Sequence, residues 1–253
     1  CIIALGQIAD CDDQPADIAI RDGLMKVKDE LADQMARNFA LIALAQCSGR
    51  PGTGGTDPIA GLNVKKDSPR SFLLNELAKG KSQVKPWAAL ALGVMERSLS
   101  DAKYTTNADV RGALRLALKE AKSATEVGAY AIAVGLIKDP DTKEVLREKL
   151  ASIQEDDARG YVAIGIGLVD DRGAIGQIQE IIRKSKYKPD LLKSAAIGLG
   201  LLGDKGIVEE LVTMLGDASA LSSQAAISSA LGFIGDARSI DPLIAMLQDK
   251  QKT

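Results

Sequence analysis

Residues 195–204 have the sequence Ala-Ala-Ile-Gly-Leu-Gly-Leu-Leu-Gly-Asp, in which an Ala-rich apolar run contains a glycine and an aspartate lies four residues after it. This pattern recurs toward the C-terminus at steps of 32, 33 and 32 residues, with its glycines at Gly135, Gly167, Gly200 and Gly232. The trailing acids are Asp139, Asp171, Asp204 and Asp236. Such a period is typical of stacked repeats, in which each unit buries its apolar face only against its neighbours.

The unit at residues 191–221 shows how one repeat is built. Apolar residues at i, i+3, i+4 and i+7 predict one helix over residues 192–202, and a second apolar stripe predicts another over residues 207–215. Gly203 can take the left-handed conformation that ends a helix, and Asp204 can accept backbone N–H groups at the start of the next. The glycine-bearing helix of each unit is called helix A below, and the helix after the aspartate is called helix B.

The run Ala-Leu-Gly-Phe-Ile-Gly-Asp-Ala-Arg-Ser-Ile-Asp-Pro-Leu at residues 230–243 resembles a HEAT-like repeat of the phycobilisome-lyase type. The resemblance is good over about residues 128–253 and weaker before that. It implies an all-α protein, an α/α superhelix of about seven stacked helical hairpins. The motif specifies this fold far better than it specifies a function.

Seven units are expected to form a single array over residues 1–253, and the opening resembles the middle of a helix A, which predicts a truncated first hairpin. Insertions at about residues 48–71 and 98–107 are expected to separate helix A from helix B. The larger one contains a Gly- and Pro-rich run at residues 49–58, which predicts irregular structure. The expected units are residues 1–34, 35–83, 84–126, 127–158, 159–190, 191–221 and 222–253.

The repeated glycine has a cost that packing must offset. A glycine inside a helix is about 0.5 to 1 kcal/mol less favourable than alanine. Six of the seven units nevertheless place glycine at this position, and Ala45 takes it in the second. Helix crossings too close to admit a Cβ would compensate for the loss.

Composition excludes several classes of function. The net charge of -2 gives no general reason for binding nucleic acid or anionic lipid. The longest apolar runs are shorter than the roughly 20 residues that cross a bilayer, so no membrane span is expected. The chain has no histidine, which excludes Ser-His and Cys-His nucleophilic sites and the His-Glu iron sites of the deoxyhypusine hydroxylases, enzymes that share HEAT-like repeats. No catalytic residue, cofactor or metal is therefore predicted.

Three motifs that look chemical have simpler explanations. Residues 198–203 match the dinucleotide fingerprint G-x-G-x-x-G, but that motif works after a strand, whereas here it ends a helix. Residues 10–13 (Asp-Cys-Asp-Asp) suggest a calcium loop, but Pro15 and Arg21 stand where glycine and glutamate are required. The acidic clusters at residues 155–157 and 170–171 fall in inter-helix turns, where capping explains them.

The cysteines fit neither a metal site nor a disulfide framework. Cys1 and Cys47 are predicted to be small buried residues on helices, and Cys11 to be a turn residue.

Charged residues on the B helices are the candidate binding residues. Arg111, Arg115 and Lys119 fall on one side of the third helix B, an arrangement that suggests the cationic channel of HEAT-like alkylpurine glycosylases. Later B helices contradict a continuous channel, because they carry the acids Glu144, Glu148, Glu180, Glu209, Glu210 and Asp241. Nucleic acid is accordingly not the expected partner.

The leading hypothesis is a non-enzymatic scaffold whose B helices line a concave surface that binds another protein or peptide. The larger insertion departs most from the repeat and is either a second place for specificity, with Arg50, Lys65, Lys66 and Arg70, or a loop without a fixed position. A bilin-lyase role, suggested by the resemblance, and DNA binding are the alternatives. The pattern does not indicate the cellular compartment or the identity of the partner.

Overall fold

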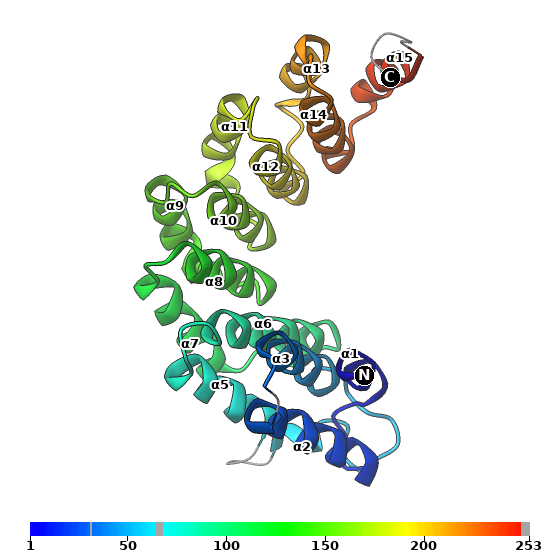
Figure 1. Cartoon of the computed structure of the whole chain (residues 1–253), viewed down its shortest axis with the longest axis vertical. Coiled ribbons are helices and arrows are strands. Elements are labelled where there is room, and N and C mark those ends of the chain that lie inside the picture. The colour runs from blue at the N-terminus through cyan, green and yellow to red at the C-terminus, as the bar shows by residue number, and fades with distance from the viewer. Residues whose placement is uncertain (31, 64–67, 249–253) are drawn as a thin grey trace. The chain divides into compact units, whose positions relative to one another are not determined.

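The computed structural model describes residues 1–30, 32–63 and 68–248, and within these ranges it contains helices and no strands. It divides into two compact units, residues 1–137 and 138–253. Within each unit a helix packs against the one after it where a helix B precedes a helix A (Figure 1). The predicted fold class, an all-α solenoid, is confirmed.

The described residues of the first unit form four A helices and three B helices, which alternate along the chain as the repeats predict. Its A helices are α1 (Ile2–Ile8), α3 (Gln34–Ser48), α6 (Lys85–Asp101) and α8 (Ala124–Leu136). Its B helices are α2 (Pro15–Glu30), α5 (Pro69–Lys79) and α7 (Ala108–Glu120). One short extra helix, α4 (Ala60–Asn63), lies between α3 and α5.

The second unit begins with a helix B. Its A helices are α10 (Asp156–Leu168), α12 (Pro189–Leu202) and α14 (Leu221–Ile234). Its B helices are α9 (Lys143–Ser152), α11 (Ile175–Lys184), α13 (Val208–Asp217) and α15 (Ile240–Gln248). Short 3-10 turns precede three of them, at η1 (Pro140–Thr142), η2 (Arg172–Ala174) and η3 (Ala237–Ser239).

Local chemistry sets where several helices begin and end. The Asp33 carboxylate accepts the backbone N–H groups of the first turn of α3. Ser123 and Glu126 form a capping box at the start of α8. Gly203 and Gly235 end α12 and α14 with φ of 68° and 65°, the left-handed conformation predicted for Gly203.

Four of the repeated glycines lie where successive A helices cross. A Cβ at Gly6 of α1 would lie 2.6 Å from the Cα of Ala43 in α3. A Cβ at Gly200 of α12 would lie 2.6 Å from the carbonyl oxygen of Phe233 in α14. Similar approaches occur at Gly93 against Ala133 and at Gly167 against Gly198. The predicted close crossings are confirmed, and they explain why glycine is kept inside these helices.

In the second unit, successive helices lie closer together on the A side than on the B side. Contacts between α10 and α12 and between α12 and α14 are dense, whereas α9, α11 and α13 contact one another sparsely. Within this unit, α10, α12 and α14 follow the inside of the curve, and α9, α11 and α13 follow the outside (Figure 1). The expectation that B helices line a concave surface is therefore wrong for this unit, because the backbones approach most closely on the A side.

Both predicted insertions are shorter than expected. Ser48 is the last residue of α3, and Ser68 already caps α5, whose first residue is Pro69. In the second insertion α6 continues to Asp101, and the Asn107 side chain caps α7. The predicted insertions begin too early, because polar residues such as Ser98 and Ser100 suggest a loop although they belong to α6.

Gly200→Ala is expected to lower the free energy of unfolding by about 1 to 3 kcal/mol, because the added methyl meets the α14 backbone. Gly232→Ala is the matched control. Gly232 holds the same repeat position, but a Cβ there meets no atom within 4 Å, so the change should be neutral or stabilising by up to about 1 kcal/mol. Chemical denaturation measures both variants, and equal effects would contradict the proposed crossing.

Candidate interaction surfaces

Ion pairs join successive repeats along the B side of the second unit. Arg147 of α9 pairs with the buried carboxylate of Asp171, which belongs to the next repeat. One repeat later, Gln179 takes the position of Arg147 and donates to Asp204 over 2.9 Å. Asp204 was expected to cap α13, but it accepts this side chain instead, and the N-cap of α13 is Ile207. The trailing aspartates therefore connect neighbouring hairpins.

The predicted acidic residues fall into two groups. Glu180 and Glu210 both pair with Arg183, and Glu209 pairs with Arg238. Arg183 holds the pKa of the Glu210 carboxyl below its usual value, chiefly by hydrogen bonding, so that carboxylate stays charged. The remaining three are exposed, and no ion pair joins them to another described residue: Glu144, Glu148 and Asp241.

The predicted basic residues of α7 are only partly available to a ligand. Arg111 and Arg115 are half-buried, whereas Lys119 is exposed. The Nε atom of Arg111 is buried without a hydrogen-bond partner in the described part of the chain. Arg115 stands one 32-residue period before Arg147 and is itself engaged with a partner. These residues form no continuous exposed cationic row.

The basic residues assigned to the larger insertion hold the fold together where the structure describes them. Arg50 donates from Nη1 to the carbonyl oxygens of Gln7 and Ala9, at 2.7 and 2.8 Å, and so stabilises the end of α1. Arg70 pairs with the fully buried Glu96 at 2.7 Å. Lys65 and Lys66 lie outside the described residues.

The Gly-rich part of this insertion packs onto the turn between α1 and α2. The Gly54 N–H donates to Asp12 over 3.0 Å, and the Thr56 N–H and hydroxyl donate to Asp13 over 2.9 and 2.7 Å. A Cβ at Gly52 or Gly55 would meet these same aspartates, so the loop needs glycine there. Residues 52–56 of the insertion are thus held against the turn between α1 and α2.

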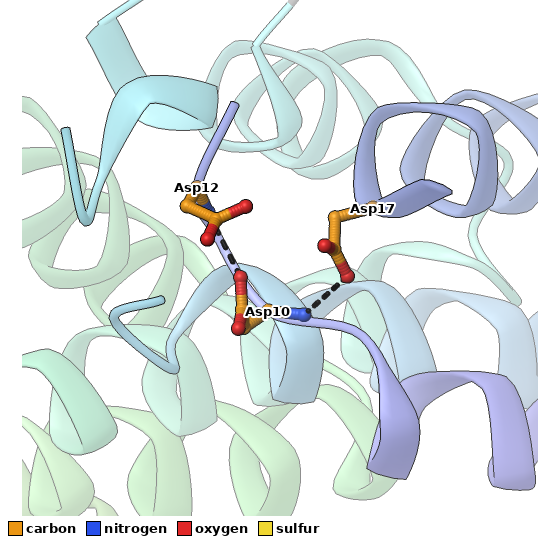
Figure 2. A group of neighbouring side chains, drawn as sticks. All are labelled: Asp10, Asp12 and Asp17. Atoms are coloured by element: carbon orange, nitrogen blue, oxygen red, sulfur yellow. Dashed lines mark hydrogen bonds between the residues drawn. The ribbon is translucent and has the colours of Figure 1, made fainter. Parts of the chain in front are cut away.

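The same turn brings three carboxylates together, as Figure 2 shows. One oxygen from each of Asp10, Asp12 and Asp17 lies within 4.8 Å of the others. Asp17 accepts the Asp10 N–H and Asp10 accepts the Asp12 N–H, each over 3.1 Å. Backbone N–H groups, that of Gln14 first, lower the pKa of Asp12 and keep it ionised. The three carboxylates lie at the connection between α1 and α2 and accept backbone N–H groups of that segment.

The other chemical-looking motifs are explained by packing as well. Gly198 and Gly200 approach the backbones of α10 and α14, and Gly203 ends α12, so the G-x-G-x-x-G match belongs to the repeat. Cys11 and Cys47 are buried, and burial raises the pKa of the Cys11 thiol to about 11. Cys1 was expected to be buried but is exposed at the N-cap of α1.

A surface that the charge pattern did not reveal lies on the A helices. The positions six and three residues before the repeat glycine and one after it follow i, i+3, i+7 spacing and share one helix side. They carry no charged residue in any A helix of either unit after α1, and nearly all are half-buried or exposed. We call these positions the uncharged A-helix face. In the first unit it comprises Phe39, Ile42, Gln46, Trp87, Leu90, Val94, Ala129, Ile132 and Leu136. In the second it comprises Tyr161, Ile164, Leu168, Ser194, Ile197, Leu201, Ala226, Ser229 and Phe233.

Aromatic residues concentrate on this face. The chain has only eight aromatic residues, and four of them occupy it. Tyr161 and Phe233 are 50% and 48% exposed. Phe39 and Trp87 contact edge to face with ring centroids 5.9 Å apart. The signal was present in the sequence as an uncharged row at repeat spacing, but it was missed because A-helix apolar residues were all assigned to the core.

Comparison with known families agrees with this architecture. The family model described as HEAT repeats matches residues 178–253, from within α11 to the end of the chain. It does not specify the phycobilisome-lyase type. No curated protein matches the chain. No helix in the described part of the chain has the length and apolar character that a bilayer crossing needs.

Acid should weaken the last hairpin through Asp236. Hydrogen bonds from Arg238 lower the pKa of this carboxyl from 3.8 to about 2. A folded-state pKa below the unfolded one stabilises the protein above the unfolded pKa, and this contribution is lost as the pH falls through the folded value. Asp236→Asn should therefore flatten the decline of the unfolding free energy between about pH 4 and pH 2. Asp241→Asn, in α15, is the control. If both variants show the same pH dependence of the unfolding free energy, the stabilising role of Asp236 is contradicted.

Proposed function

We propose that this chain, a HEAT-like repeat protein, is a non-enzymatic scaffold that binds another protein through its uncharged A-helix face. HEAT repeats support an interaction role in general. The single observation that carries the proposal is the absence of charge from this face in a chain with 26% charged residues.

The residue composition of the face resembles that of a protein interface more than that of a surface in contact only with water. Protein interfaces are depleted of charge at their centres and enriched in aromatic residues. Tyr161, Leu201 and Phe233 leave about half of their surface open in the second unit. Their position on rigid, closely crossing helices means that little conformational entropy is lost on binding.

Charged residues around the face would act at the rim of an interface. Glu144, Glu148 and Asp241 are exposed and are proposed as peripheral contacts that steer association. Glu180, Glu209, Glu210, Arg111, Arg115 and Lys119 contribute less to binding in this proposal, because neighbouring groups already engage them or partial burial restricts them.

Nucleic acid and bilin fit less well. Phosphate binding needs a continuous cationic surface, and the B helices of the second unit present carboxylates alongside their arginines. No observation specific to this chain favours bilin chemistry over protein binding.

The double variant Ile197→Glu with Leu201→Glu tests the proposal by placing two charges in the centre of the second unit's face. Affinity capture from the source cell should lose the specific partner, with at least a tenfold weaker signal, because the partner's apolar surface would face unpaired carboxylates. Gln177→Glu, on the exposed side of α11, is the control and should retain it. Capture that is unchanged in the double variant, with folding verified by circular dichroism, would contradict the proposed surface.

A further inference from the structure

The first unit has a second apolar feature, a groove between two B helices. It has a volume of about 400 Å³ and lies between the C-terminal halves of α5 and α7. Leu74 and Leu77 of α5 and Leu116 of α7 provide much of its apolar lining, and Tyr130 of α8 also lines it. The groove is distinct from the uncharged A-helix face, because its main walls belong to the B helices.

Comparison between repeats shows that this groove is chemically unusual. The buried residues Leu114, Leu146 and Ile178 are spaced by 32 residues and align α7 with α9 and α11. In this alignment, Leu116 corresponds to Glu148 and Glu180, which are exposed acids. Leu116 is 56% exposed, so the third repeat places an apolar side chain in solvent where later repeats place a charge.

Small residues on α7 keep the groove open. Ala113 and Ala117 lie in its lining, and one repeat later the corresponding residues are Val145 and Lys149. The equivalent hollow between α9 and α11 in the second unit is only about 170 Å³. The larger volume in the first unit thus results from particular side chains and not from the repeat geometry alone.

One phenol lines the groove. It belongs to Tyr130 of α8, a residue that is 3% exposed. Burial, aided by the charge of Glu126, raises the pKa of Tyr130 to about 12, so the phenol remains a neutral donor near neutrality. Because Tyr130 lines the groove, a ligand seated there can offer an acceptor to this phenol.

Charges of both signs line the groove together with the apolar residues. They are Lys85, the first residue of α6, Glu120 in the last turn of α7, and Glu126, whose carboxylate belongs to the capping box of α8. No ion pair engages Lys85 or Glu120 in the described part of the chain. A ligand with an acidic group toward Lys85 and a basic group toward Glu120 would complement both.

We propose that this groove binds an amphipathic helix of another protein, which inserts large apolar side chains beside Leu116 and offers an acceptor to the Tyr130 hydroxyl. A helix suits the groove because residues at i, i+3 and i+4 reach along an apolar channel from one side. The proposal rests on the interaction role proposed above but assigns it a second, chemically different surface.

A displayed library of helical peptides, randomised at positions i, i+3, i+4 and i+7, tests this with the full chain as bait. Enriched peptides should carry leucine, phenylalanine or methionine as anchors. In fluorescence anisotropy, Leu116→Glu should weaken their binding at least tenfold, and Tyr130→Phe about threefold or more. Leu247→Glu changes an exposed leucine of α15 outside the groove and should leave the dissociation constant within twofold.

Several outcomes would overturn the proposal. They are the absence of any enriched peptide, and enriched peptides that bind Leu116→Glu as well as the unmodified chain. Peptides that respond to Tyr161→Lys and not to Leu116→Glu would overturn this site while leaving the proposed function intact. A dimer that Leu116→Glu dissociates, seen by sedimentation, would assign the groove to a second copy. An anilinonaphthalene dye that binds there while no peptide does would assign it to a small molecule.

Discussion

Backbone contact between successive A helices is the constraint on which the rest of each unit depends. At Gly6, Gly93, Gly167 and Gly200 the next A helix lies so close that a Cβ would meet its backbone. Each of these glycines costs helix stability by itself, and the gain comes from dense packing against the next hairpin. A single hairpin therefore has little reason to be helical alone, and order comes from stacking.

This constraint also shapes the surfaces. In the second unit the A helices approach closely while the B helices remain apart and are joined by pairs such as Arg147 with Asp171 and Arg183 with Glu210. Arg183 and Glu210 are both exposed to solvent, and exposed ion pairs contribute little to stability, so such pairs do not replace the A-side packing. Close A helices bring their uncharged outer positions into neighbouring rows, whereas separated B helices leave room for a groove such as the one between α5 and α7.

Much of the fold could be predicted because its signals are local and periodic. The glycine spacing, the apolar stripes and Gly203 located the hairpins and explained the G-x-G-x-x-G match. The side that each helix turns outward was not predictable in the same way, since the periodicity of an A helix does not show which apolar residues the next hairpin covers. The docking of Gly54 and Thr56 on Asp12 and Asp13 joins residues more than 40 positions apart, and no short-range pattern encodes it. Arg50 and Arg70 were selected for their charge, and only their partners, the end of α1 and Glu96, reveal their structural role.

Hydrogen exchange of the backbone amides, followed by mass spectrometry, tests the central role of the A-helix crossings most directly. Exchange slows where packing must open before the amide reaches water. If the A-helix crossings hold the unit together, α10 and α12 will exchange at least tenfold more slowly than α11 and α13 in the same unit. Equal protection of the two helix sets, or slower exchange in α11 and α13, would contradict this role of the crossings.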